Sequence, residues 1–182
     1  MVATVHALPA DAVPRGYPAP PAESFSWWDF DRLLAEVGDE LDPAARAGLV
    51  AAIERHRGWA ADVDRVVCHG DVHPGNVVMT AAGAVLLDWD LLCSGPPGWD
   101  HAMLLTLPRW GWPARWYDDF ASGYGRSLAD DPTAQAIAEL RLVAATLMRL
   151  RAGRADPAAM TEARRRLAFW RGDPDAPTWR AQ

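Results

Sequence analysis

Lysine is absent from this sequence of 182 residues, so that all 18 of its basic side chains are arginines. Cysteine is rare as well: Cys68 and Cys93 are separated by 25 positions, and both follow apolar residues. This spacing matches neither a CxxC pair nor a Cys/His metal motif. We therefore expect two buried free thiols in a reducing compartment and not a disulfide.

Long apolar runs and basic clusters are also missing. No stretch approaches the roughly 18 apolar residues of a membrane span, and the first 16 residues lack the features of a signal peptide. The net charge of -6 comes without a basic stripe that would attract nucleic acid. These absences favour a cytoplasmic protein without nucleic-acid or membrane partners. With 50% hydrophobic residues, the chain can bury a core and form one domain.

What the sequence does contain is a series of helix signals. Apolar residues recur at helical spacing between positions 30 and 41, after Asp29 as a capping residue. Asp-Pro pairs at 42–43, 131–132 and 156–157 each place a capping carboxylate before a proline at the first helical position. The helices that follow these pairs are expected to end near Gly58, Gly153 and Gly172.

Between these helices the hydrophobic period changes to that of strands. Residues 65–68, 76–79 and 84–87 are short β-branched or aliphatic runs, and a turn at 81–83 joins the last two into a hairpin. Prolines make residues 9–22 a loop or an extended arm. The tryptophan-rich stretch over residues 110–116 is expected in the core or in the wall of a groove. The pattern predicts a mostly helical fold around a small β insertion.

One segment concentrates the residue types that carry chemistry. It reads HGDVHPGN at residues 69–76, and DWD follows at residues 88–90. Phosphoryl transfer from a nucleotide needs a carboxylate near the attacking hydroxyl and oxygen ligands for magnesium. Asp71, Asn76 and Asp88 are of these types, and Asp71 precedes Asn76 by five residues, as in kinase catalytic loops. The predicted hairpin would return Asp88 to the neighbourhood of Asn76.

HGDVHPGN followed by LLDWD resembles the catalytic loop and metal-binding segment of the aminoglycoside phosphotransferase and choline kinase superfamily. GWDHA at residues 98–102 resembles an acidic turn of these enzymes, and residues 3–9 resemble the end of the helix after their interlobe hinge. The resemblance implies an α+β, mostly α fold: a protein-kinase-like C-terminal lobe with a short catalytic-loop β-hairpin and without the N-terminal ATP-binding lobe. Residues 1–22 would then be a proline-rich arm with a remnant of the post-hinge helix, 23–172 the lobe and 173–182 a tail.

The same resemblance assigns roles to individual residues. Asp71 would be the catalytic base or orient the acceptor hydroxyl, and Asn76 and Asp88 would bind magnesium. The resemblance also implies supporting residues, of which His69 and Asp100 would be structural, His73 a loop contact and Asp90 an acid on the substrate side. The implied activity is ATP-dependent phosphorylation of a small-molecule hydroxyl, with Mg²⁺ and ATP as cofactors and a small hydroxylated substrate that could be cationic.

Two parts of such a kinase are missing from these residues. No GxGxxG-like loop precedes the catalytic segment, and no lysine is present to pair with phosphates. We therefore expect a truncated or partial member that begins inside the first element after the hinge and cannot turn over alone. Its expected partner is a missing N-terminal lobe or a partner chain. Without that partner, Leu87, Trp89 and Leu91 should present an exposed apolar surface.

Other interpretations remain open on the sequence alone. His69, Asp71 and His73 alternate as the ligands of a zinc or iron hydrolase would in an extended segment. The chain could also be a non-catalytic substrate-binding or interaction module. Asp118-Asp119 and Asp130-Asp131 could meet an ammonium-bearing substrate or simply face solvent. The arginine run at 164–166 is expected on a solvated helix face.

Overall fold

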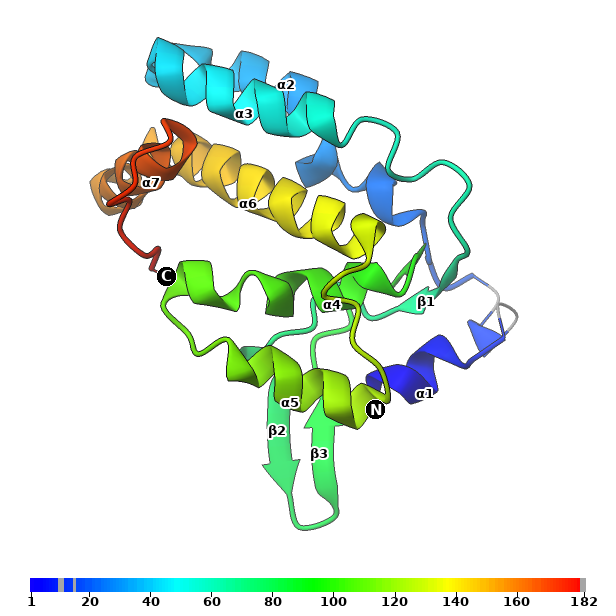
Figure 1. Ribbon diagram of the computed structural model, residues 1–182. Helices are drawn as coiled ribbons and strands as arrows, with labels where there is room; N and C mark the ends of the chain where they lie inside the picture. The colour runs from blue at the N-terminus through cyan, green and yellow to red at the C-terminus, as the bar shows by residue number, and fades with distance from the viewer. Residues whose placement is uncertain (10–11, 15, 181–182) are drawn as a thin grey trace.

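The computed structural model describes residues 1–9, 12–14 and 16–180 and is mostly helical (Figure 1). Its α-helices are α1 (Val2–His6), α2 (Phe30–Glu36), α3 (Pro43–Arg55), α4 (Gly98–Leu105), α5 (Arg115–Tyr124), α6 (Pro132–Gly153) and α7 (Pro157–Trp170). Its strands are β1 (Val66–Cys68), β2 (Val77–Thr80), β3 (Gly83–Leu86) and β4 (Cys93–Gly95). The expected mostly α, α+β class is confirmed.

The predicted helix starts are confirmed by their caps. In α2, α3, α6 and α7 the aspartate before the first residue accepts a hydrogen bond from a backbone N–H of the first turn, which satisfies a donor that has no partner inside the helix. The capping residues are Asp29, Asp42, Asp131 and Asp156. The ends agree less well, since α3 stops at Arg55, three residues before the predicted Gly58.

Helix α6 is the centre of the larger hydrophobic core. It packs against α7, α4, α3 and α2, and in Figure 1 it lies between the α2–α3 pair and α4. Its buried side chains include Ile137, Leu140 and Leu147, none more than 2% exposed. Trp99 of α4 is also fully buried there and contacts the rings of Trp27, Trp28 and Trp59. A helix surrounded by others explains why its sequence is apolar over most of its circumference.

A second, smaller core lies on the other side of α4. It joins α1, α4, α5 and the base of the hairpin. The buried residues in this cluster are Val2, Val72, Leu86, Leu104, Leu107, Tyr117 and Ala121. The HGDVHPGN segment contributes Val72 to this core, while the preceding Cys68 belongs to the larger one. The segment therefore runs between the two cores and is held from both sides.

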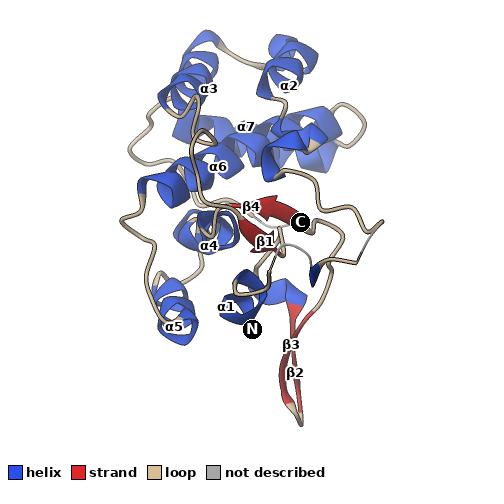
Figure 2. Ribbon diagram, turned by 90° about the vertical axis from the view of Figure 1, so that its right-hand side faces the viewer, coloured by secondary structure: helices blue, strands red, loops and turns tan. Residues whose placement is uncertain are grey.

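The strands form two separate antiparallel pairs. β2 and β3 make the predicted hairpin, with Val77 opposite Leu86, and the hairpin projects from the helical body (Figure 2). Its apolar side chains Val78, Met79 and Val85 are exposed. β1 pairs with β4, which the sequence did not predict, and this places Cys68 opposite Cys93. Both cysteines are buried and free, as expected.

Both ends of the described chain contact the helical body. Residues 10, 11 and 15 of the proline-rich stretch lie outside the described residues, but His6 before it is hydrogen-bonded to Asp100 of α4. At the other end, Trp179 is 2% exposed and packs against Trp110 and Phe169. The division at residues 22 and 172 stays a prediction.

The arginine run of α7 is only partly solvated. Arg164 is exposed, whereas Arg166 is 2% exposed, with Nε bound to Glu162 at 3.2 Å and Nη1 donating to the carbonyl oxygen of Ala145. The expectation of a solvated face is therefore wrong for Arg166, because a buried glutamate on the same helix neutralises it. None of the described helices is long and apolar enough to cross a membrane.

Candidate active site

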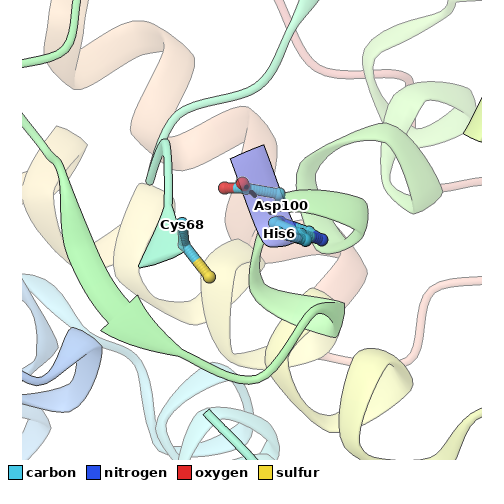
Figure 3. A group of neighbouring side chains, drawn as sticks. All are labelled: His6, Cys68 and Asp100. Atoms are coloured by element: carbon cyan, nitrogen blue, oxygen red, sulfur yellow. Dashed lines mark hydrogen bonds and ion pairs between the residues drawn. The ribbon is translucent and has the colours of Figure 1, made fainter. Parts of the chain in front are cut away.

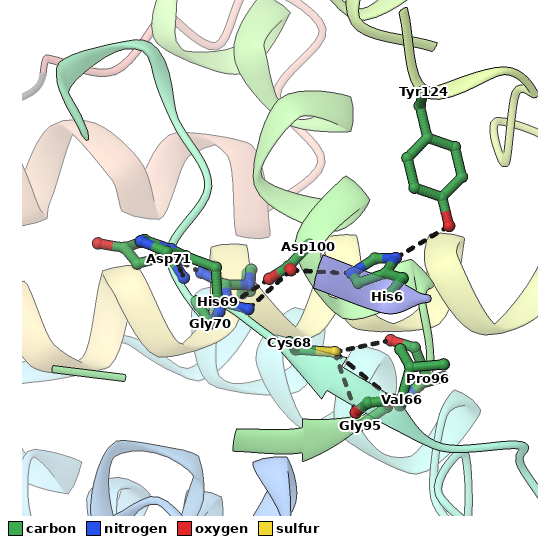
Figure 4. Close-up of polar contacts among 11 residues, drawn as sticks. His6, Val66, Cys68, His69, Gly70, Asp71, Gly95, Pro96, Asp100 and Tyr124 are labelled. Carbon is green, nitrogen blue, oxygen red and sulfur yellow. Dashed lines mark hydrogen bonds and ion pairs between the residues drawn. The ribbon is translucent and has the colours of Figure 1, made fainter. Parts of the chain in front are cut away.

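Asp100 holds the start of the HGDVHPGN segment. Its carboxylate is fully buried and accepts hydrogen bonds from the backbone N–H groups of His69 (2.9 Å) and Gly70 (2.8 Å) (Figure 4). His6 reaches the same carboxylate through Nε2 at 3.0 Å, and its Nδ1 lies 2.9 Å from the hydroxyl of Tyr124. A buried carboxylate needs such donors to replace water. Asp100 therefore fixes the backbone from which Asp71 projects.

Gly70 is required by this arrangement. Its φ of +93° lies in the left-handed region, and a Cβ at this position would lie 1.9 Å from the carbonyl oxygen of Leu91. Its own carbonyl oxygen accepts a hydrogen bond from Arg141 Nη2. The glycine thus lets the loop turn tightly against the segment that follows the hairpin.

The two ring nitrogens of His69 both have backbone partners. Its ring is fully buried, and Nε2 donates to the carbonyl oxygen of Leu87 at 2.8 Å. Because Nε2 carries the proton, Nδ1 is free to accept the backbone N–H of Asp71 at 3.2 Å. Trp89 packs edge-on against the ring. Both ring nitrogens are therefore occupied, which argues against a metal triad of His69, Asp71 and His73.

Asp71 is half-buried, with 31% of its side chain exposed. Its Oδ2 lies 3.5 Å from Nε2 of His73, and its Oδ1 lies 3.7 Å from Nη1 of Arg141. Burial raises the pKa of Asp71, but the hydrogen bond from His73 and the charge of Arg141 outweigh it and leave the pKa below its usual value. Asp71 is thus an ionised carboxylate at neutral pH.

Asn76 and Asp88 are brought together by the hairpin. The amide nitrogen of Asn76 donates to the carbonyl oxygen of Asp71 at 2.9 Å, which directs the amide oxygen elsewhere. The backbone N–H of Leu87 donates to the carbonyl oxygen of Asn76 at 2.8 Å, so that Asp88 follows the residue paired with Asn76. This confirms the predicted return of the chain.

Two further features surround this pair. Asp88 is exposed and has a φ of +61°, a conformation that is uncommon outside glycine and concentrated at functional sites. His73 caps the turn at Pro74–Asn76 by accepting the N–H of Gly75 through Nδ1 at 3.0 Å, and its role as a loop contact stays a prediction. Asp90 is exposed beside this segment.

Arg141 is the site residue that sequence reasoning missed. It lies in the middle of α6, is 9% exposed, and stacks its guanidinium over the rings of Trp27 and Trp99. It contacts both Gly70 and Asp71, while its buried Nε has no hydrogen-bond partner among the described residues. The helical spacing could have predicted that Arg141 is buried, since it follows Ile137 by four residues and so lies on the same buried face of the helix.

A second cluster lies behind the loop. Ligand atoms of His6, Cys68 and Asp100 all lie within 4.8 Å of one another (Figure 3). The Cys68 thiol is 3.5 Å from the carbonyl oxygens of both Gly95 and Pro96, and contact with Cys93 together with burial raises its pKa far above the usual value. Metals bind the thiolate, and the Asp100 oxygens already have three donors, so these contacts describe a hydrogen-bonded brace.

The expected apolar surface near the carboxylates is present in part. Leu87 is 45% exposed, whereas Trp89 and Leu91 are each half-buried. Trp89 is held by its indole N–H, which donates to the carbonyl oxygen of Leu86 at 3.0 Å, and by its packing on His69. Trp89 therefore packs against His69 of the loop and is only partly exposed to solvent.

The HGD turn, Asn76 and Asp88 all lie in a part of the chain that matches a known protein family. The sequence profile of the phosphotransferase enzyme family (APH) matches residues 1–142. The chain belongs to the phosphotransferase enzyme family. A search of curated proteins finds no match.

Two solved structures share the fold of this phosphotransferase family member. The apoenzyme of macrolide 2'-phosphotransferase MphH from Brachybacterium faecium is 21% identical, with a TM-score of 0.57 over 91% of this chain and 56% of that one. LicA in complex with AMP is 17% identical, with a TM-score of 0.53 over 93% of this chain and 60% of that one. The chain therefore spans less than two thirds of the length of either structure.

Proposed function

We propose that this chain carries the base and the metal ligands of an ATP-dependent phosphotransferase that phosphorylates a small-molecule hydroxyl. The observation that supports this most is the juxtaposition at the loop: Asp71 and Asn76 are joined by a hydrogen bond, and the hairpin returns Asp88 beside them. In this proposal residues 23–172 are the substrate-side, C-terminal lobe of a kinase-like protein, and Asp90 is an acid at the substrate side.

Asp71 would orient the acceptor. Its carboxylate is ionised and half-exposed, so it can accept a hydrogen bond from an alcohol. As the alcohol oxygen forms its bond to the transferred phosphorus and the bond to the leaving phosphate breaks, the hydroxyl proton passes to Asp71. The low pKa suits a loose transition state, in which the proton moves late. Arg141 and His73 would hold the carboxylate in place for this step.

Asn76 and Asp88 would hold magnesium. An amide oxygen and a carboxylate oxygen are ligands that this hard cation prefers. The residues fit this role, because the hydrogen bond from the Asn76 amide nitrogen leaves the amide oxygen to coordinate and because the Asp88 carboxylate is exposed. When bound, the ion neutralises charge on the phosphate oxygens.

A kinase of this type pairs the nucleotide phosphates with a lysine, and this chain contains no lysine. The cation that pairs with the phosphates would then be an arginine of this chain or a group supplied by another lobe or chain. We propose the second, since the guanidinium that contacts Asp71, that of Arg141, is already committed to Gly70 and Asp71. Turnover by these 182 residues alone is then not expected.

Titration of Mn²⁺ and of Mg²⁺-ATP into the purified chain tests the metal ligands. Asp88→Asn should abolish Mn²⁺ binding, because it removes the charge of one proposed ligand. Asp90→Asn is the matched control, since it neutralises a second exposed carboxylate only two residues away. Equal loss of Mn²⁺ binding in both variants, or no Mn²⁺ binding by the unmodified chain, would count against Asp88 as a metal ligand and favour a non-catalytic substrate-binding module.

A further inference from the structure

Two adjoining cavities lead away from Asp71 along α6. The smaller, of about 270 Å³, is lined by Asp71, Arg141 and Leu91 among others, and the larger, of about 500 Å³, by Trp112, Arg149 and His73 among others. Both are bordered by the same four residues, Met103, Trp110, Ala145 and Met148. The shared lining residues place the two cavities next to each other, and we treat them as one groove that starts at the proposed base.

The walls of this groove are apolar and aromatic. Leu107 and Trp112 line one part, and Trp27, Leu142 and Ala144 line another, in addition to the four shared residues. A groove of this size and lining suits a compact ligand with one or two rings. It offers few polar groups, so most of the binding free energy would come from burial of apolar surface.

Apart from Asp71, the charged side chains that line the groove are arginines. Asp71 is the single carboxylate among the described residues that line it, and Arg141 already lies against it. The far part is lined by Arg149 and by Arg166, whose guanidinium is paired with the buried Glu162. The acidic pairs at 118–119 and 130–131, which the sequence offered as contacts for an ammonium group, lie outside both linings. Beyond Asp71, an ammonium group would find no carboxylate among the described residues that line the groove.

We propose that this groove binds the acceptor substrate, an apolar ring-bearing alcohol without an ammonium group, whose far end is neutral or acidic. The inference rests on the proposed function in one respect, since Asp71 is taken as the group that meets the hydroxyl. The alcohol would lie at Asp71 between Met103 and Ala145, and the ring would extend toward Trp110 and Trp112. The expected substrate class is thereby narrowed from small hydroxylated compounds in general to apolar ring-bearing alcohols without an ammonium group.

Three naphthalenemethanols that differ only in a second substituent, methyl, carboxylate or aminomethyl, test the charge preference by calorimetry without nucleotide or metal. We expect the methyl and carboxylate compounds to bind at least about tenfold more tightly than the aminomethyl compound. Arg149→Gln should reduce the affinity for the carboxylate compound relative to the methyl compound. Tightest binding of the aminomethyl compound, or no binding of any of the three, would overturn the proposal.

The location is tested by filling the groove. Ala145→Leu adds volume where the two cavities meet and should weaken binding of the methyl compound at least about tenfold. Ala47→Leu makes the same change on the exposed side of α3 and should leave it unaltered. Unchanged affinity in a folded Ala145→Leu variant would contradict the location. If the compounds bind as expected while Asp88→Asn leaves Mn²⁺ binding intact, the groove stands and the proposed function falls.

Discussion

At the scale of single residues, the site depends on buried groups at which a substitution would break hydrogen bonds or overlap with neighbouring atoms. Asp100 has no exposed surface and accepts three hydrogen bonds, and Gly70 has a carbonyl oxygen where its side chain would be. Each satisfies a constraint that comes from a distant part of the chain. The effects of substituting such residues are therefore separable into backbone conformation, steric overlap and charge.

A comparison of Gly70→Ala with Gly125→Ala separates the cost of the backbone conformation from the cost of steric overlap. In Gly70→Ala, the new Cβ meets both an unfavourable φ and the Leu91 carbonyl oxygen, so the free energy of unfolding should fall by about 3 kcal/mol. Gly125→Ala has a similar φ, +101°, with nothing near its Cβ, and should cost only about 1 kcal/mol. Urea unfolding of both variants measures the difference. Equal losses would show that the loop yields to the added methyl group.

His101 gives a pH dependence. Burial, with the charge of His6, lowers its pKa to about 4, and its ring meets the Tyr117 hydroxyl at 3.2 Å. Between the unfolded-state pKa of about 6.5 and pH 4 the unfolded chain binds a proton that the folded chain does not, so stability is lost as the pH falls. The loss is at most about 3 kcal/mol. Urea unfolding at pH 7 and pH 5 should show a smaller pH dependence for His101→Gln; an unchanged dependence would rule out His101 as its source.

At the scale of elements, α6 joins the core to the site through Arg141. Arg141→Met removes the donor to the Gly70 carbonyl oxygen and the cation beside Asp71, and should lower the free energy of unfolding by about 3 kcal/mol. It should also raise the pKa of Asp71, which nuclear magnetic resonance can follow. Arg151→Met, on the same helix, breaks only a half-exposed ion pair with Glu36 and should cost less than about 1 kcal/mol. If the pKa of Asp71 stays low in Arg141→Met, the hydrogen bond from His73 is sufficient to lower it.

The elements also show what sequence could predict. Local signals were sufficient where a structure is local: Asp131 caps α6, and the hairpin pairs Val77 with Leu86. Strand β4 was missed because Cys93-Ser94-Gly95 holds no β-branched residue, and its partner β1 lies about 25 residues away. Arg141 was missed for the same reason, since its contacts with Gly70 and Asp71 cross about 70 positions. Motif spacing indicated the loop, but tertiary packing decides what surrounds it.

At the scale of the whole molecule, the C-terminal segment completes the larger core. The ring of Trp179 meets those of Trp110 and Phe169, and its backbone N–H donates to the carbonyl oxygen of Arg109 at 2.8 Å. Trp179→Ala should therefore lower the free energy of unfolding by about 3 to 4 kcal/mol. Thr178→Ala, at the exposed neighbouring position, should change it by less than about 0.5 kcal/mol. Chemical denaturation of the two variants compares them, and similar small losses would mean that this segment is not part of the cooperative fold.

The Asp100 carboxylate also has a consequence for how the molecule opens. It binds His6 near the N-terminus and the loop at residues 69–70, and His6 in turn meets Tyr124, so four distant segments must assemble before the HGD turn has its shape. The amide hydrogens of His69 and Gly70 can exchange with deuterated solvent only when this assembly separates. Exchange at these two amides would therefore report the opening of the contacts around Asp100 separately from the opening of the α6 core.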